Sequence, residues 1–152
     1  MPVTINGTSG ISSPYLNTTS NFSSVQVSVT NGKGSTNTSV FRWTNVLSNT
    51  GSDITYTDST TLGGYFTINT AGMYAISITC DANTNGATFG ITNSASPADA
   101  NYYVNALSTS ANYPNTMATT LYLPAGTVLY GYAGSPAGTN NARSRMTVSR
   151  VG

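Results

Sequence analysis

Two β-strands and the turn between them can be recognised in Tyr65–Cys80, YFTINTAGMYAISITC. In Met73–Cys80 apolar residues alternate with small or polar ones, and this period of two is typical of a strand with one buried face. The positions expected to point inward are Tyr74, Ile76, Ile78 and Cys80. Tyr65–Ile68 is the preceding strand. Asn69 and Gly72 in the connection between the two strands are residues that can take positive φ.

Further strand signals recur at short spacing on both sides of this stretch. They are Val25–Val29, Val40–Trp43, Ala87–Thr92, Tyr102–Leu107, Thr116–Leu123, Thr127–Tyr132 and Ser144–Arg150. A tight turn containing Pro124 and Gly126 separates two of them. No apolar period of 3.6 residues is sustained, so helix is expected to be nearly absent. The sequence therefore predicts an all-β sandwich or barrel.

The first 24 residues differ from the rest of the chain. They are polar and rich in Gly and Ser, with isolated apolar residues that include Val3, Ile5, Ile11, Tyr15 and Leu16. This is too sparse for an independent fold. It is enough for an extended arm, residues 1–24, that anchors the domain of residues 25–152 to a partner. A disordered tail is the alternative.

Ionised side chains are scarce throughout the sequence. Only 6% of the 152 residues are charged and the net charge is +1, whereas about 25% is usual in a soluble domain. A surface of Ser, Thr, Asn and Gly can be buried against another protein without burying a full charge. We therefore expect much of the surface to be an interface, although such surfaces also occur in all-β extracellular or viral proteins of any oligomeric state.

The same composition argues against several partners. Five scattered basic residues give no electrostatic footprint for nucleic acid or anionic lipid. No apolar run is long enough to span a membrane, and the N-terminus does not resemble a signal peptide. We therefore expect neither a nucleic-acid nor a membrane partner.

Residues suited to catalysis are also lacking. There is no His, which excludes Ser–His–Asp and Cys–His mechanisms, and a single Cys80 cannot form a zinc site. Asp53 and Asp58 are close in sequence, but side chains that bond to the local backbone of a turn explain them better than a catalytic pair. We expect a non-enzymatic protein with no catalytic residue, metal or cofactor, and a buried, inert Cys80.

Ten tyrosines are the remaining candidates for a functional surface. Tyr supplies a large contact area and a hydroxyl at low entropic cost, which suits subunit contacts. The candidates for such a contact are Tyr102, Tyr122, Tyr130 and Tyr132. Stacking of exposed Tyr and Trp43 on a host glycan is the alternative.

Two stretches carry a family resemblance over about residues 40–152. Gly64–Ile76 resembles the Phe-Thr-x-x-x-x-Gly-x-Tyr signature of the complement/tumour-necrosis-factor-type jelly roll. Ala118–Val128 is similar to that family's Leu-x-x-Gly-Asp-x-Val motif, with Thr127 where Asp is usual. The closing strand, Ser144–Gly152, also ends the chain where the family's last strand does.

The resemblance implies a jelly-roll sandwich of about ten antiparallel strands that packs as a homotrimer, with aromatic residues near the threefold axis. The positions that it places in the core are Phe66, Ile68, Tyr74, Ile76, Leu121, Leu123 and Val128. The opening Val3–Ile11 also resembles the beginnings of small bacteriophage virion proteins.

Together these observations suggest a protein of the phage virion, made in the host cytoplasm. The leading hypothesis is a trimeric capsid decoration, or cement, protein whose arms bind the major capsid protein or another virion protein. The alternative is the receptor-binding tip of a head or tail fibre that recognises a host-surface glycan.

Overall fold

The computed structural model describes residues 4–6, 10–12, 22–29, 33, 35–37, 39–81, 86–97, 101–107, 114–134 and 144–152. They form twelve strands. The strands are β1 (Thr4–Asn6), β2 (Gly10–Ser12), β3 (Ser24–Val29), β4 (Asn45–Thr50), β5 (Ile54–Thr57), β6 (Tyr65–Ile68), β7 (Gly72–Asp81), β8 (Thr88–Thr92), β9 (Tyr102–Leu107), β10 (Pro114–Leu123), β11 (Val128–Ala133) and β12 (Ser144–Arg150). The described residues contain no α-helix.

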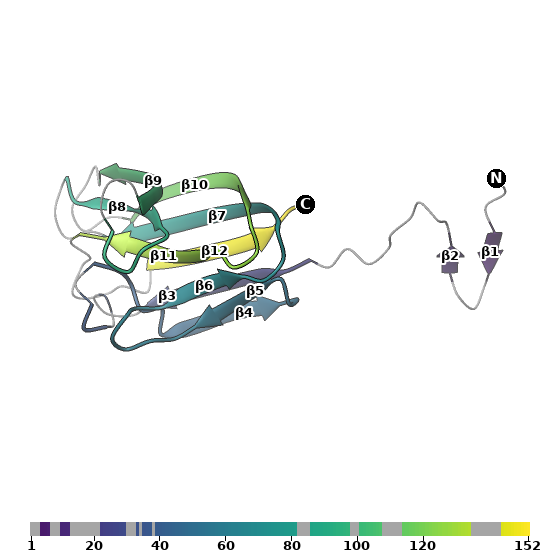
Figure 1. Cartoon of the computed structure of the whole chain (residues 1–152), viewed down its shortest axis with the longest axis horizontal. Coiled ribbons are helices and arrows are strands. Elements are labelled where there is room, and N and C mark those ends of the chain that lie inside the picture. The colour runs from purple at the N-terminus through teal and green to yellow at the C-terminus, as the bar shows by residue number, and fades with distance from the viewer. Residues whose placement is uncertain are drawn as a thin grey trace.

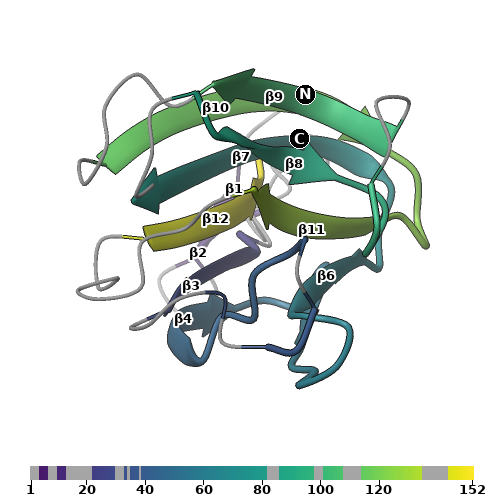
Figure 2. The same cartoon turned by 90° about the vertical axis from the view of Figure 1, so that its left-hand side faces the viewer.

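Ten of these strands form two five-stranded antiparallel sheets that pack face to face (Figures 1 and 2). The first sheet has the order β10-β7-β12-β3-β4, and the second has the order β5-β6-β11-β8-β9. Chain neighbours such as β7 and β8 lie in different sheets, so the chain crosses between the layers as a jelly roll does. The predicted all-β jelly-roll sandwich is confirmed.

Alternation along the strands explains how the core forms. β7 buries every second residue, including Tyr74, Ile76, Ile78 and Cys80, as its sequence predicts. In β12 the buried residues include Met146 and Val148, which lie opposite Val27 and Val25 of β3. The two inner faces together bury the main hydrophobic cluster of the molecule.

Most of the expected core positions lie in this cluster. Phe66, Ile68, Tyr74, Ile76 and Leu123 are buried. Leu121 is half-buried and packs against the cluster from β10. Val128 does not point inward, because β11 turns Leu129 toward the core and Val128 therefore faces the opposite side.

The predicted strand Val40–Trp43 is wrong. Phe41 and Trp43 are buried, which produced an apolar pattern like that of a strand. However, the segment makes a single isolated bridge, between Val40 and Tyr132, and belongs to neither sheet. The true strand follows it: β4 has five exposed residues among six, so it lacks the apolar alternation that would reveal it.

Two glycines have roles that differ from one another. Gly126 has a φ of 84° and occupies the third position of the turn that is closed by the Thr127 N–H on the Pro124 carbonyl, as type II turns require. Gly72 was expected to supply a positive φ, but it is the first residue of β7. A Cβ there would lie 2.5 Å from the carbonyl oxygen of Gly152, so close packing explains this glycine.

The first two strands form a small hairpin of their own. β1 and β2 pair antiparallel, with Ile5 opposite Ile11, and make a separate two-stranded sheet (Figure 1). The sandwich itself begins just before β3, where Ser23 is already buried. Of the predicted anchoring residues, Val3, Tyr15 and Leu16 lie outside the described residues.

Candidate functional site

The outer face of the first sheet is lined by small, uncharged side chains. Along β7, β10 and β12 the outward positions include Ala75, Ser77, Thr79, Thr116, Ala118, Thr120, Thr147 and Ser149. The register brings these strands into line: Ala118 lies opposite Ser77, and Thr120 lies opposite Ala75. Side chains directly opposite one another share a face, so the three strands present one continuous surface.

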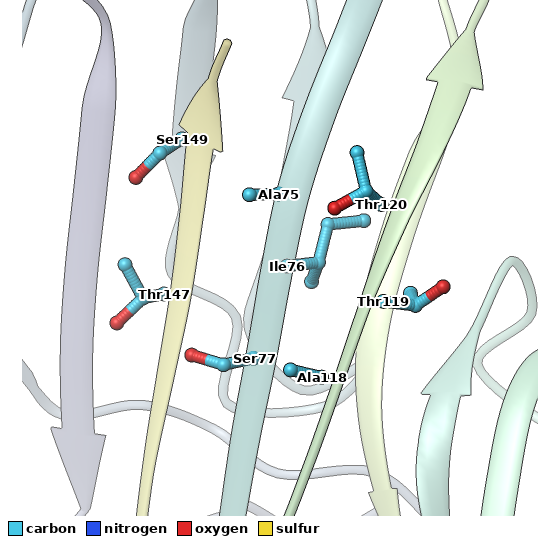
Figure 3. Close-up of a pocket in the computed structure, with 8 residues that line it drawn as sticks. All are labelled: Ala75, Ile76, Ser77, Ala118, Thr119, Thr120, Thr147 and Ser149. Carbon is cyan, nitrogen blue, oxygen red and sulfur yellow. The ribbon is translucent and has the colours of Figure 1, made fainter.

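This surface has a hollow at its centre. The hollow has a volume of about 460 Å³. Its lining includes Ala75 and Ser77 of β7, Ala118 and Thr120 of β10, and Thr147 of β12 (Figure 3). Alanine, serine and threonine side chains are short, so they leave a depression on the outer face of the sheet. The hollow is therefore a shape into which a neighbouring protein surface can pack.

Larger apolar groups stand at one end of the same face. Tyr122 lies opposite Met73 across β10 and β7. Their side chains are 64% and 39% exposed, which places them among the most exposed large apolar residues of the described chain. Aromatic residues beside small ones are typical anchors of protein interfaces. Tyr122 is therefore the leading candidate for such an anchor.

The hydroxyls of this face are partly satisfied by one another. Ser24 and Ser149 are hydrogen-bonded at 2.7 Å, and Thr79 and Thr116 at 2.9 Å. The amide of Gln26 donates to Thr147 at 3.2 Å. Burial of a polar group costs less when the group already has a partner. This face can therefore be removed from water at low cost.

Charge is nearly absent from this face. Among the exposed and half-buried side chains at its described outward positions, only Arg145 of β12 carries a charge, and Asp81 at the end of β7 is buried. The Arg42 guanidinium pairs instead with Asp58 through contacts of 2.7 and 2.8 Å, and it lies outside the strands. The hydrogen bond from Arg42 holds the pKa of Asp58 below its usual value.

The four predicted contact tyrosines do not form one patch. Tyr122 belongs to the first sheet, whereas Tyr102, Tyr130 and Tyr132 belong to the second. On the second sheet the ring of Tyr130 packs against Tyr65 at 5.6 Å. Sequence spacing could not show this separation, because it depends on which sheet each strand joins.

The tyrosines of the second sheet form a row across its outer face. Tyr65 lies opposite Tyr130, and Tyr130 and Tyr132 are two residues apart on β11. Tyr132 makes an edge-on contact with Tyr102 of β9, with ring centroids 5.4 Å apart. Trp43 cannot join this row, because it is 1% exposed and packs against Phe41 in the core. The expectation of an exposed Trp43 is therefore wrong.

The two aspartates that are close in sequence have separate long-range partners. Asp58 pairs with Arg42, and Asp53 accepts hydrogen bonds from Ser23 at 2.8 Å and from Arg150 at 3.2 Å. The expected turn bonding therefore does not account for Asp53. Because each carboxylate is engaged with its own arginine, the two do not form a catalytic pair.

Other reactive groups are few in the part of the chain that the structure describes. Burial raises the pKa of the Cys80 thiol to about 12, so it is protonated and inert at neutral pH. No three His, Cys, Asp or Glu side chains gather there as a metal site. Nor does that part contain a helix whose length and apolarity would suit a membrane crossing.

Comparison with known proteins shows that this chain resembles solved structures in its fold. No protein-family model and no curated protein matches the chain. Crystal structures of murine APRIL at pH 8.5 and pH 5.0 both match with a TM-score of 0.58, over 86% of this chain and 99% of theirs. Their sequence identities to this chain are 11% and 10%.

Another solved structure leads to the same conclusion. The crystal structure of pika GITRL matches with a TM-score of 0.55 and 9% identity, over 86% of this chain and 96% of that one. Such likenesses confirm the tumour-necrosis-factor-like jelly-roll fold that the motifs suggested. At these identities they carry the fold alone.

Proposed function

We propose that this chain is a structural protein of a bacteriophage particle, a homotrimeric decoration protein that stabilises the capsid shell. The observation that carries the proposal is the outer face of the first sheet. Its exposed side chains are uncharged apart from Arg145, several of its hydroxyls bond to one another, and it has a hollow at its centre and the exposed Tyr122 at one end. These are the properties of a surface that is buried against another protein.

Self-association through this face accounts for the composition of the chain. A near-zero net charge favours association, and copies of the same chain would cover the face without burying an ion pair. The tumour-necrosis-factor-like jelly roll, together with the sequence motifs, favours three copies in a closed ring. A closed ring leaves no open contact that would continue into a filament.

The N-terminal segment supplies the contact with the shell in this proposal. A trimer presents three arms, so contacts that are weak individually are strengthened by effective concentration. Because the arms would bind the coat protein in its assembled form and not as free subunits, they would stabilise the shell by mass action. The protein would act in the virion and without enzymatic activity.

The experiment uses a truncation placed by the structure. Removing residues 1–21 spares Ser23, which is buried and bonded to Asp53. We expect the truncated chain to sediment as a trimer, the full chain to sediment as a trimer or a larger assembly, and only the full chain to bind purified capsids. Capsid binding by the truncated chain would disprove arm anchoring, and a monomeric full chain would disprove the trimer.

A host-recognition role is the second candidate, and the tyrosine row of the second sheet favours it. Tyr65, Tyr130, Tyr132 and Tyr102 line one uncharged sheet face. Tyrosine rings offer apolar faces and hydroxyls, which suit a neutral sugar. A glycan array probed with the full chain and with Tyr132→Ala tests this role. Binding by the full chain that the variant loses would favour a fibre tip over a decoration protein.

A further inference from the structure

One edge strand of the sandwich is exposed and lacks the residues that usually prevent edge-to-edge pairing. β4 is the last strand of the first sheet and pairs only with β3. Its sequence, NVLSNT, contains no charged residue and no Pro, although proteins commonly use both to protect such edges. Val46 and Leu47 are 52% and 48% exposed. The edge therefore offers both unpaired backbone groups and apolar side chains.

The N-terminal hairpin lacks a neighbouring strand. β1 and β2 are three residues long each and pair only with one another. A lone two-stranded hairpin is at best marginally stable in water, and a third strand is the usual remedy. The sequences TIN and GIS also carry no charge. The chain thus contains both an unpaired sheet edge, β4, and a two-stranded hairpin, β1–β2, that a further strand would stabilise.

From these two features we infer that the β4 edge binds the β1–β2 hairpin of a second copy of this chain. Ser24 lies opposite Thr50, so the N-terminal segment joins the sandwich beside one end of β4. From Phe22 back to Ser12, ten residues can reach roughly 33–36 Å when extended. Two copies whose β4 edges face one another can therefore exchange hairpins reciprocally, as an isologous contact.

This contact would join trimers rather than build them. β4 lies at the opposite edge of the sheet from β10, and the hollow of the proposed trimer face lies over β10, β7 and β12. Burying that face therefore leaves β4 open. The inference goes beyond the proposed function, since the arms would also tie neighbouring trimers to one another on the shell.

Thiol cross-linking between two differently labelled chains tests the exchange. One chain carries Thr4→Cys or Ser12→Cys, which lie opposite one another on β1 and β2, so that either strand of the hairpin can report. The other chain carries Ser48→Cys on β4. The native Cys80 is buried and its pKa is raised to about 12, so a short bis-maleimide should not react with it.

We expect a cross-linked product with the mass of two chains when the arm variant is mixed with Ser48→Cys. The matched control replaces Ser48→Cys by Thr55→Cys, at an exposed position on β5 at the edge of the other sheet. No two-chain product should form with this control. Adding Val46→Lys to the Ser48→Cys chain should also abolish it, because a lysine guards the edge. With residues 1–21 removed, the β4 and β5 variants should all sediment as trimers, because their substitutions lie outside the proposed trimer face.

Two results would overturn the exchange. One is the absence of any two-chain product. The other is a product confined to a single chain that carries both Ser12→Cys and Ser48→Cys, which would show that the hairpin binds its own β4. If trimers decorate capsids without exchange, only this inference is wrong. If exchange occurs and capsids stay bare, the exchange stands and the proposed function is wrong.

Discussion

The hydroxyl of Ser23 donates a hydrogen bond of 2.8 Å to Oδ2 of Asp53, and the Asp53 backbone N–H donates one of 3.1 Å back to the same hydroxyl. Both residues are buried. Arg150, near the C-terminus, reaches the same carboxylate oxygen at 3.2 Å. This pair therefore joins the start of the sandwich, the β4–β5 connection and the end of β12.

Removing the Ser23 hydroxyl should destabilise the sandwich. Ser23→Ala leaves the buried Asp53 N–H without its hydrogen-bond partner and removes one donor to the Asp53 carboxylate, a loss of about 1–3 kcal/mol in the free energy of unfolding. Urea unfolding followed by tryptophan fluorescence measures this loss, since Trp43 is a core residue. Thr44→Ala, at an exposed position, is the control. Equal stability of Ser23→Ala and the parent chain would show that the pair is not structural.

Acid should weaken the fold through the two arginine-linked aspartates. The Thr70 hydroxyl, with Ser23 and Arg150, holds the pKa of Asp53 below its ordinary value of 3.8, and Arg42 does the same for Asp58. At neutral pH both carboxylates are ionised in the folded and unfolded states, so their contribution is complete. As the pH falls below 3.8 the unfolded chain takes up protons first, and stability declines until the folded carboxylates also protonate.

Thermal unfolding across the acid range provides the measurement. Because the chain has no His, we expect a plateau through about pH 5–8 and a fall below it. Asp53→Asn should be less stable at neutral pH and should show a shallower acid decline. An unchanged slope in this variant would mean that Asp53 does not contribute to the acid sensitivity.

Regular alternation explains which strands the sequence reveals. β7 has one face in the core along its whole length, so its period of two is unbroken. β4 is an edge strand with five exposed residues, and nothing in its composition distinguishes it from a loop. The segment Val40–Trp43 shows the opposite error, because Phe41 and Trp43 are buried without joining a sheet ladder. Burial predicts a strand only where the backbone also finds a partner.

A close backbone contact in this same region yields a third prediction. At Gly131 of β11 a Cβ would lie 2.6 Å from Cζ2 of Trp43, 3.0 Å from Cδ1 of Ile78 and 3.2 Å from Sδ of Met146. Gly131→Ala should therefore overpack the core and lower the free energy of unfolding by about 1–3 kcal/mol. Guanidinium unfolding of the purified variant measures the effect.

A double-mutant cycle identifies the cause of that loss. The Trp43 indole N–H has no hydrogen-bond partner among the described residues, so Trp43→Phe removes bulk without removing such a bond. If the nearest contact dominates, the pair Gly131→Ala and Trp43→Phe should be more stable than the sum of the single changes predicts. Strict additivity would place the strain at Ile78 or Met146 instead.

The candidate functional surface was harder to predict than the core. Low charge indicated an extensive neutral surface, yet it could not say which face of the sandwich carries the short side chains and the hollow. Tyr122 and Tyr130 look equivalent in the sequence, and they lie on opposite sheets because β10 joins β7 and β11 joins β6 and β8. Sheet membership depends on contacts between distant segments, which local spacing does not encode.

The neutrality of the first sheet's outer face can be tested by placing one charge on it. Ala118 is exposed on β10 and lines the hollow, so Ala118→Glu should leave the isolated sandwich folded. In a trimer that buries this face, the carboxylate would lose its water and gain no cation, at a cost of several kcal/mol per subunit. We therefore expect Ala118→Glu to sediment as a monomer at concentrations at which the parent chain is a trimer.

Two controls separate charge from shape and position. Ala118→Gln has nearly the same volume without the charge, and a trimer that tolerates it would show that the ionised group is responsible for dissociation. Thr55→Glu introduces the same charge at an exposed position of the second sheet, where the trimer should persist. If Ala118→Glu remains trimeric, the copies associate through another surface and the role assigned to this face is wrong. If Thr55→Glu also dissociates, net charge rather than the face controls association.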